Sequence, residues 1–599
     1  DIGYESRFDQ YDILIEKTMS LVPRKHRYVI EERTDINGSQ IKPINTTQFK
    51  KLIEKIKSEN FESIGIGFLH SYANSENEKI LKEFIFNNLP GVEVSISSEV
   101  CPEIREYERF TTTVINAYIK PLMSNYLKKL EYELIEKGFN CPLLLMTSGG
   151  TLTNIPSACN NPVRLVESGP AGGAILATSI ARDLGLNKVI SFDMGGTTAK
   201  ITVIENKKAI KAREFEVDRK ARFKKGSGFP LRIPVIEMVE IGAGGGSIAR
   251  VNKLEQIITG PDSAGSLPGP ACYCNGGTLP TITDADLIIG KINPENFAGG
   301  KIKLSKDLAA DAITKNISQI VNLDMDTAAL AISEIVDETM SNAARVHTVE
   351  QGHETSSRTL IAFGGAAPLH VARVAEKLKV SSIIIPTNAS VGSAVGFLKA
   401  PVGYEVVKSL RTLLKAFPVK KVNDLLKIMR EEAEKVIENK SEKNNFLEER
   451  FAYMRYAGQG HEIKVPIENN LLSIRHVDSI KSSFEKKYEK LYSRILPNAD
   501  IEILTWSLSL SIQSENENEY KELNSYTNRE ESTLVDFIDY HSEKKIKVPY
   551  FERNELNPGD LIMGQCIISE DQTTIIVSKN FNTKVLGNNF LKMEYNKNE

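Results

Sequence analysis

Alternating helical and strand-like segments are the feature that most restricts the fold of this chain. The amphipathic pattern FKKLIEKIKSEN leads into the apolar run SIGIGFL, and NSENEKILKEFIFNNL leads into VEVSISS in the same way. A long helical stretch from about Glu103 to Gly138 then precedes the apolar run PLLLM. This alternation predicts an α/β layer structure with buried parallel strands.

The chain is too long for one hydrophobic core. Its 599 residues predict two to four domains. Glycine becomes frequent from about Val163 to Ala400, and short β-like runs such as HEIKVPI and EILTWSLSLSIQ follow Pro401. We therefore expect three consecutive domains, at residues 1–162, 163–400 and 401–599, the last of them rich in β-structure.

Composition and charge exclude several classes of protein. The formal net charge of -3 argues against a nucleic-acid binder, which usually carries a basic stripe. No apolar run approaches the length of a membrane span, and the first residues do not resemble a signal peptide. Six cysteines are too few for a disulfide framework in so long a chain. We expect a cytoplasmic protein that binds neither nucleic acid nor membrane.

The sharpest motif is VISFDMGGTTAKITV, in which a glycine turn joins two apolar runs. Asp193 ends the first run and would hold Mg²⁺, which favours one or two carboxylates together with phosphate oxygens. The turn Gly195–Thr198 would bring backbone N–H groups and two hydroxyls to a phosphate. A plain β-hairpin, whose Asp and Thr satisfy turn hydrogen bonds, remains the alternative.

Two further glycine-rich turns could face a ligand. In TLIAFGGAAPLH a strand runs into Gly364 and Gly365, and the following proline begins a helix whose free N–H groups attract anions. An ordinary strand–helix turn explains this segment equally well, and His370 is expected to be packed or hydrogen-bonded. In EIGAGGGSIAR, three successive glycines and Ser247 favour a loop that faces phosphate or substrate, although the spacing fits no Walker or dinucleotide motif.

A pair of acidic residues stands in TITDADLIIG, where Asp284 and Asp286 lie two positions apart. A catalytic or metal-binding role for Asp284 and a helix cap ahead of LIIG both remain open. Cys272 and Cys274 have no second cysteine pair nearby, which disfavours a zinc site or an iron–sulfur cluster. Ser168 does not match the Gly-x-Ser-x-Gly pattern of serine hydrolases.

Taken in order, the motifs resemble the hydantoinase A family, and the resemblance covers essentially the whole chain. That family includes N-methylhydantoinase A, the matching part of ATP-dependent 5-oxoprolinase, and the nucleotide-binding subunits of acetone and acetophenone carboxylases. The segments that carry the resemblance are REYERFTTTVINAYIKP, MTSGGTLTN, VESGPAGG, FDMGGTTAK, VEIGAGGGSIA, GPDSAGSLPGPACY, GGTLPTITDAD, FGGAAPLH, RYAGQGHEIKVPI and GQCIISEDQTTIIV.

The resemblance implies a fold similar to the actin, sugar-kinase and heat-shock-chaperone ATPases. Two ribonuclease-H-like α/β subdomains would clamp ATP, the first incomplete at residues 1–162 and the second at 163–400, with the β-rich domain after them. The segment from Asp193 to Lys200 matches the family's second phosphate loop, with Asp193 on the metal. The nucleotide-side residues implied in this way, or expected from the glycine loops, are Gly195, Gly196, Thr197, Thr198, Lys200, Gly244, Gly245, Gly246, Ser247, Gly364 and Gly365.

The sequence departs from the family at its front. Family members usually begin with an Asp-x-Gly-Gly-Thr phosphate loop and a His-Gly-Thr-Thr stretch, and neither occurs here. We expect a truncated chain whose phosphate clamp a separate N-terminal polypeptide would complete.

The resemblance implies the nucleotide-handling subunit of an ATP-dependent cyclic-amide hydrolase of the hydantoin or 5-oxoproline type. ATP and Mg²⁺ would be its cofactors, and a hydantoinase-B-like subunit its partner in acting on a small-molecule substrate. Asp193 and, less directly, Asp284 are the expected catalytic residues. The nucleotide-binding subunit of a ketone carboxylase and a non-catalytic scaffold subunit are the alternatives.

Overall fold

The computed structural model describes residue 9 and residues 11–15, 18–220, 226–437, 446–512, 523–530 and 533–596. The chain forms two compact units, each assembled from separate stretches. The first contains residues 1–168, 211–235 and 400–515, and the second contains residues 169–210, 236–399 and 516–599.

The observed units divide the chain differently from the three consecutive domains expected. Changes of unit near residues 168 and 400 fall close to the expected boundaries, but residues 400–599 are shared between both units. A shift in composition along a sequence does not reveal which distant segments pack together. The three-domain division therefore stays a prediction, while the α/β class is confirmed.

The second unit is built on a ten-stranded mixed sheet. At its centre β7 (Lys188–Met194), β15 (Thr359–Phe363) and β16 (Ser382–Ile385) run parallel, and β8 (Ala199–Glu205) returns antiparallel to β7. The complete order is β12 (Met238–Ile241), β8, β7, β15, β16, β28 (Leu591–Tyr595), β27 (Phe581–Val585), β24 (Asp560–Ile562) and β21 (Thr527–Asn528), with β9 (Lys208–Ala209) paired to β8.

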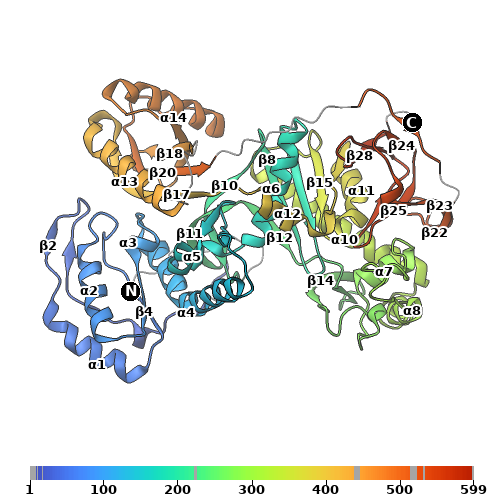
Figure 1. The fold of residues 1–599 in the computed structure, drawn as a ribbon, viewed down its shortest axis with the longest axis horizontal. Coiled ribbons are helices and arrows are strands. Elements are labelled where there is room, and N and C mark those ends of the chain that lie inside the picture. The colour runs from blue at the N-terminus through green and yellow to red at the C-terminus, as the bar shows by residue number, and fades with distance from the viewer. Residues whose placement is uncertain are drawn as a thin grey trace. The chain divides into compact units, whose positions relative to one another are not determined.

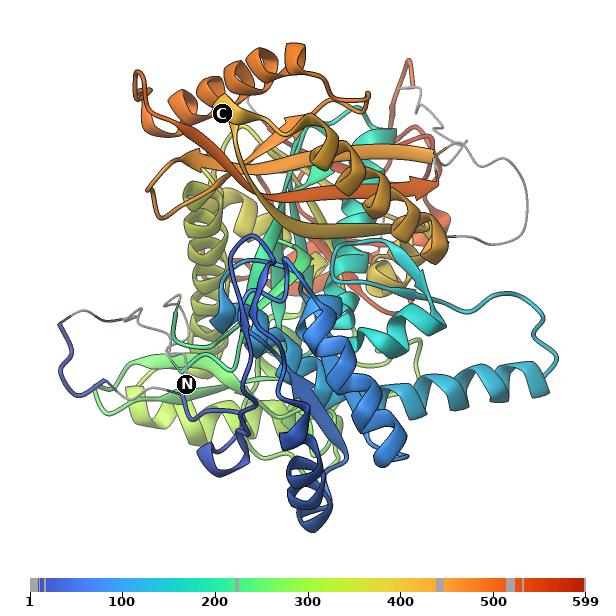
Figure 2. The same ribbon diagram turned by 90° about the vertical axis from the view of Figure 1, so that its left-hand side faces the viewer.

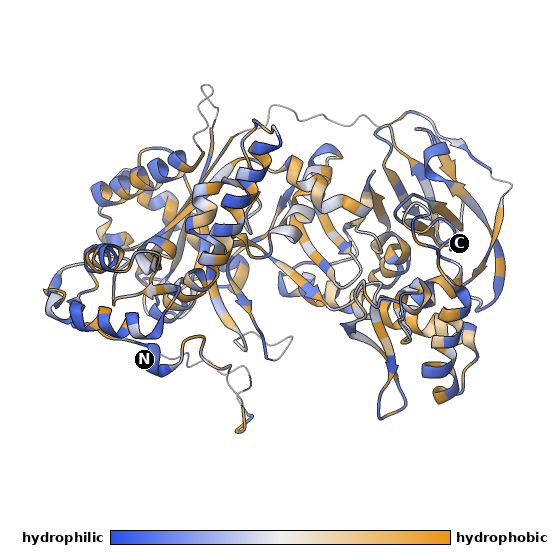
Figure 3. Ribbon diagram, turned by 60° about the horizontal axis from the view of Figure 1, so that its bottom comes forward, coloured by the Kyte–Doolittle hydropathy of each residue, from blue (hydrophilic) through white to orange (hydrophobic). Residues whose placement is uncertain are grey.

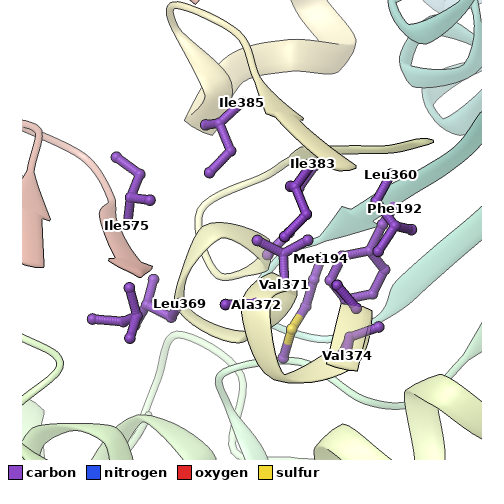
Figure 4. Close-up of a cluster of buried hydrophobic side chains, with 14 of the residues drawn as sticks. Phe192, Met194, Leu360, Leu369, Val371, Ala372, Val374, Ile383, Ile385 and Ile575 are labelled. Atoms are coloured by element: carbon purple, nitrogen blue, oxygen red, sulfur yellow. The ribbon is translucent and has the colours of Figure 1, made fainter. Parts of the chain in front are cut away.

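Helices bury the central strands of this sheet. Side chains of α11 (Ala367–Leu378) meet Phe192, Met194, Leu360 and Ile383 of the strands (Figure 4). Strands covered in this way read as nearly continuous apolar runs, as VISF and TLIAF do. The other helices of the unit are α6 (Ser168–Asp183), α7 (Ile282–Ile289), α8 (Lys306–Ile313), α9 (Gln319–Val321), α10 (Met325–Glu350) and α12 (Gly392–Lys399), several of them labelled in Figure 1.

Two smaller β-structures complete the second unit. One is the hairpin of β13 (Ser247–Val251) and β14 (Ile257–Ser263), and the other is a four-stranded sheet. The strands of that sheet, in order, are β22 (Leu534–Ile538), β23 (Lys545–Glu552), β25 (Cys566–Ser569) and β26 (Thr574–Val577).

The first unit begins with the predicted helix–strand alternation. The pattern FKKLIEKIKSEN forms α1 (Phe49–Glu59), and the apolar run after it contributes β3 (Ser63–Ile66), which pairs in parallel with β4 (Glu93–Ile96). The long helical stretch forms α4 (Glu106–Glu136). The remaining elements here are β1 (Arg33–Thr34), β2 (Gln40–Lys42), α2 (Glu76–Asn88), α3 (Ser97–Val100), β5 (Leu144–Met146), β6 (Leu152–Asn154), α5 (Ile155–Asn160), β10 (Lys211–Val217) and β11 (Phe229–Ile236).

A second layer of the first unit comes from the later part of the chain. An antiparallel sheet with the order β17 (Gly403–Leu413), β20 (Ile501–Ile512), β18 (Phe446–Tyr456) and β19 (Ile463–Ile467) buries Trp506. Its helices are α13 (Val419–Ile437) and α14 (Val477–Tyr492), drawn in orange with the long strands in Figure 2.

Helix ribbons alternate between hydrophilic and hydrophobic residues in Figure 3. Within the described residues, no helix is both long and apolar enough to span a membrane.

Candidate functional site

The turn between β7 and β8 presents its tip to solvent. Asp193 and Lys200 face each other in the antiparallel register, and the N–H of Gly195 donates to the carbonyl of Thr198 at 3.1 Å. Gly196 and Thr197 are exposed, whereas Met194 and Ala199 on either side are fully buried. A buried pair of strands thus holds a short polar turn whose glycines leave open space above the backbone.

Asp193 lies near the end of β7 and is partly buried. Its Oδ2 accepts a hydrogen bond at 3.1 Å from Ser393, the second residue of α12. Burial raises the pKa of this carboxyl, and the Ser393 hydroxyl and the Lys200 ammonium oppose the rise only in part. A carboxylate that has lost water and gained few donors is well suited to a cation that restores its charge balance.

The Gly364 turn approaches Asp193 directly. Gly364 has φ +93°, and a Cβ at this position would lie 2.6 Å from Oδ1 of Asp193. The N–H of Ala366 donates to the carbonyl of Met194 at 2.9 Å, so the start of α11 is fastened to the end of β7. Only glycine satisfies both the positive φ and the close approach.

The triple-glycine loop packs against the same turn. The N–H groups of Gly245 and Gly246 donate to the carbonyls of Gly195 and Gly196, at 3.1 and 2.7 Å. A Cβ on Gly244 would lie 2.6 Å from the carbonyl carbon of Gly196. These contacts bring the three predicted glycine turns together around Asp193, although the backbone donors of Gly245 and Gly246 are used within the protein.

The side chains of Lys200 and Ser247 also lie beside the glycine turns described above. Lys200 donates to Thr198 at 2.9 Å and also pairs with Glu240 at 3.3 Å. Ser247 is buried, and its hydroxyl accepts the N–H of Gly244 at 2.9 Å. The lysine therefore lies beside the turn that the sequence assigns to phosphate, whereas Ser247 stabilises the shape of its own loop.

Asp284 is held in a different way. It is the third residue of α7, and it forms a capping box with Thr281. Its oxygens accept hydrogen bonds from the Thr281 N–H and hydroxyl and from the N–H groups of Ala271 and Cys272, at 2.7 to 3.2 Å. Four donors and complete burial match the capping alternative, and a catalytic role for Asp284 stays a prediction.

His370 belongs to a buried ionic network, which confirms the prediction that it is hydrogen-bonded. Its Nδ1 lies 2.8 Å from Asp337 and its Nε2 lies 3.1 Å from Asp286. Lys291 pairs with Asp286 at 2.8 Å and with the hydroxyl of Ser333 at 3.0 Å. Three helices, α7, α10 and α11, are therefore joined by charged groups that are buried away from solvent.

The described residues contain no group of three or more Cys, His, Asp or Glu side chains arranged to hold a metal ion. Asp193 is a single carboxylate next to a turn with free space. Such a donor set fits Mg²⁺ only when phosphate oxygens and water supply the other ligands.

Ser393 contacts Asp193 in the candidate site, and the sequence did not predict it. It stands in NASVGSAVGF, whose two glycines give a weaker signal than the double and triple glycines elsewhere. Gly392 and Gly396 of that segment are tightly packed, and a Cβ on Gly392 would lie 2.8 Å from Phe363. The two glycines of this segment were therefore the sequence feature that could have indicated close packing of α12 beside Asp193.

Models of one protein family match three successive parts of the chain. Three models described as Hydantoinase/oxoprolinase match: the N-terminal region at residues 1–89, the main domain at 109–406, and the C-terminal domain at 417–596.

Individual relatives cover nearly the whole chain. An uncharacterized protein of Methanocaldococcus jannaschii is 37% identical over 97% of this chain and 84% of its own length. The caprolactamase subunit alpha of Pseudomonas jessenii is 29% identical over 96% and 82%. The acetone carboxylase beta subunit of Xanthobacter autotrophicus is 26% identical over 94% and 80%.

Among solved structures, the ATP-dependent caprolactamase from Pseudomonas jessenii superimposes with a TM-score of 0.84. It is 27% identical, and the match covers 99% of this chain and 85% of that chain.

Proposed function

Because the chain belongs to the hydantoinase/oxoprolinase family, we propose that it is the nucleotide-handling subunit of an ATP-dependent cyclic-amide hydrolase. The observation that carries the proposal is the meeting of three glycine turns at Asp193. Such turns let a phosphate chain lie close to the backbone, and the carboxylate lies where a phosphate-bound cation would be. The related caprolactamase is described as ATP-dependent, and a lactam is a cyclic amide.

The strand order supports a particular fold for the second unit. The run β12–β8–β7–β15–β16, with β8 antiparallel and the last three strands parallel, is what a ribonuclease-H-like subdomain of an actin-type ATPase would require. We assign the β7–β8 turn to the phosphates and the Gly364 turn to the nucleotide side.

The chemistry follows from the stability of the amide. Resonance makes the ring carbonyl a poor electrophile, and transfer of the γ-phosphoryl group from ATP to the carbonyl oxygen would activate it. ADP is released in this transfer; one water then adds to the carbon, the ring C–N bond breaks, the nitrogen takes a proton, and the carbonyl carbon remains as an acyl phosphate. A second water hydrolyses the acyl phosphate to the carboxylate and inorganic phosphate. The protein's contribution is to position the reactants and to neutralise charge.

The residues at the turn have distinct tasks in this scheme. The open backbone of Gly195 and Gly196 and the hydroxyls of Thr197 and Thr198 would bind the phosphates, with Lys200 adding positive charge. Asp193 would hold Mg²⁺, which supplies charge neutralisation at the β- and γ-phosphates when bound. Asp284 has its four donors already and would support the fold of the adjoining loop rather than contact the metal.

A partner subunit is part of the proposal. The caprolactamase and acetone carboxylase relatives are both described as subunits. We propose a hydantoinase-B-like partner that carries the hydrolytic part of the reaction.

Ketone carboxylation is the second candidate function, favoured by the match to the acetone carboxylase beta subunit over 94% of this chain. The same phosphoryl transfer would then go to an enolate or to bicarbonate.

A test that separates the two candidates measures phosphate release from Mg-ATP by the chain together with its partner. The assay adds 5-oxoproline, hydantoin or caprolactam in one series, and acetone or acetophenone with bicarbonate in another. We expect ATP consumption to depend on a cyclic amide and to match the ring-opened product in amount. Dependence on a ketone would establish the second candidate, and failure of both series would leave a scaffold subunit.

A further inference from the structure

A small pocket in the first unit is not used by the proposed function. It is lined by the turn between β5 and β6, by Arg164, and by residues that begin β10 and β17. The lining residues are Thr147, Gly149, Thr151, Arg164, Lys211, Pro234, Tyr404 and Glu405. The turn is the MTSGGT segment, one of the glycine motifs of the sequence.

The turn is fixed in shape by contacts on its inner side. The N–H of Ser148 donates to the carbonyl of Arg164 at 2.8 Å, and the Ser148 hydroxyl also donates to the carbonyl of Val166. Gly150, with φ +80°, donates its N–H to the carbonyl of Thr147 at 3.0 Å. The hydroxyls of Thr147 and Thr151 lie 3.1 Å apart and border the pocket.

Two cations border the same pocket with donors to spare. The Arg164 guanidinium lies 4.4 Å from the centre of the Tyr404 ring and donates one N–H to the carbonyl of Glu405 at 2.8 Å. The ammonium of Lys211 is half-buried, and across the described part of the chain it has no hydrogen bond or ion pair. The positive charge of Lys211 interacts with the carboxylate of Glu405, which lines the same pocket.

Glu405 does not neutralise these cations fully. One of its oxygens accepts the Ser507 hydroxyl at 2.6 Å. Burial disfavours its charged form, yet Lys211 and Lys464 keep the pKa of this carboxyl below its usual value. Burial and the nearby Lys211 in turn lower the pKa of Lys464, although Glu405 opposes them. Arg164 and Lys211 thus line the pocket with two positive charges against the one negative charge of Glu405.

We propose that this pocket is a binding site for the carboxylate group of a small organic acid. The pocket has room for about one or two water-sized groups, which suits a compact headgroup whose remaining atoms stay outside. The planar guanidinium and the Thr151 hydroxyl offer donors to the two oxygens of a carboxylate, because the Thr147 hydroxyl already donates to the carbonyl of Thr151 at 3.0 Å. Lys211 gains a hydrogen-bonding partner. Its lining residues all belong to the first unit, and the binding proposed requires neither ATP nor a partner subunit.

The test uses saturation-transfer NMR on the full chain with acetate and propionate, and with the neutral acetamide and propionamide as matched probes. We expect the carboxylates to bind and the amides not to bind. Lys211→Met is expected to weaken carboxylate binding at least about fivefold, whereas Lys211→Arg retains it. Lys253→Met, a change at an exposed lysine of the second unit, serves as the control.

Three results would overturn the proposal. Equal binding of acids and amides would show that charge is not recognised. Wild-type binding by a folded Lys211→Met variant would place the acid elsewhere. Competition by inorganic phosphate at lower concentration than acetate would assign the pocket to phosphate. Since ATP is absent from the assay, each result is independent of the proposed phosphoryl transfer.

Discussion

At the scale of single residues, Gly364 shows how little space separates the turns around Asp193. Two independent properties of this position require glycine. The φ of +93° is a backbone conformation that other residues rarely adopt, and the close approach to the Asp193 carboxylate leaves no room for a Cβ. Gly276 has nearly the same φ, +92°, but a Cβ added there would meet no atom within 4 Å. The two glycines therefore form a matched pair.

Gly364→Ala is expected to lose Mg-ATP binding by at least about tenfold, whereas Gly276→Ala keeps it. Both changes strain the backbone by about 1 kcal/mol or more, but only the first pushes against Asp193 and Met194. Calorimetric titration checks binding, and thermal melting checks the fold. Equal loss in both variants would mean that backbone strain alone explains the effect.

Much of the candidate site could be predicted from the sequence, and the rest could not, for physical reasons. Asp193 and the glycines were visible in the sequence, because three glycine-rich turns have few structural uses. Ser393 was not, since a serine at the start of a helix usually has only a local role. The sequence also did not show that the carboxylate of Asp284 accepts four hydrogen bonds, because two of the donors are backbone N–H groups of residues 271 and 272.

At the scale of secondary-structure elements, the network of Asp286, Lys291, Asp337 and His370 ties three helices together. Burial would lower the pKa of His370, but the two aspartates overcome it and raise that pKa. Burial would also raise the pKa of Asp286, but Lys291 and His370 hold it at about 2. The folded state therefore favours the charged form of both groups.

His370→Gln is expected to destabilise the protein by about 3 kcal/mol, because two buried carboxylates lose part of their compensation. The control is His461→Gln, which changes an exposed histidine of the first unit. Denaturant unfolding of both variants measures the difference. A loss below about 1 kcal/mol in the His370 variant would show that the network contributes little.

The network also predicts a pH dependence with a definite sign. A raised folded pKa of His370 contributes stability that is complete below the unfolded value of about 6.5 and is lost as pH rises through the folded value. Asp286 contributes stability above about pH 4 that is lost as pH falls toward 2. Melting temperatures across this range should fall at both ends, and His370→Gln should remove the alkaline fall. An unchanged alkaline fall in that variant would assign it to another group.

At the scale of the whole molecule, the chain changes unit five times. Local patterns predicted α1, β3 and α4 well, since each depends on neighbouring residues. The same patterns did not reveal that β28, from the end of the chain, pairs with β16 in the central sheet. Strand pairing across about two hundred residues leaves no periodic signal in either segment.

Deleting residues 516–599 is therefore expected to unfold the second unit rather than to remove a separate domain. The deletion removes β21, β24, β27 and β28 from the central sheet together with the entire four-stranded sheet, and it leaves the edge of β16 unpaired. Soluble yield and the far-UV melting curve are the measurements, and a chain ending at residue 596 is the control. A truncated protein with the melting temperature of the full chain would contradict the discontinuous unit.

Asp193 is proposed to hold the cation of a bound nucleotide, and calorimetric titration with Mg-ATP measures this binding. Asp193→Asn is expected to weaken Mg-ATP binding at least about tenfold, while Asp311→Asn, at an exposed carboxylate, binds as the wild type does. Removing Mg²⁺ with a chelator should bring the wild type down to the level of Asp193→Asn. Undiminished, metal-dependent binding by a folded Asp193→Asn variant would show that Asp193 does not hold the cation.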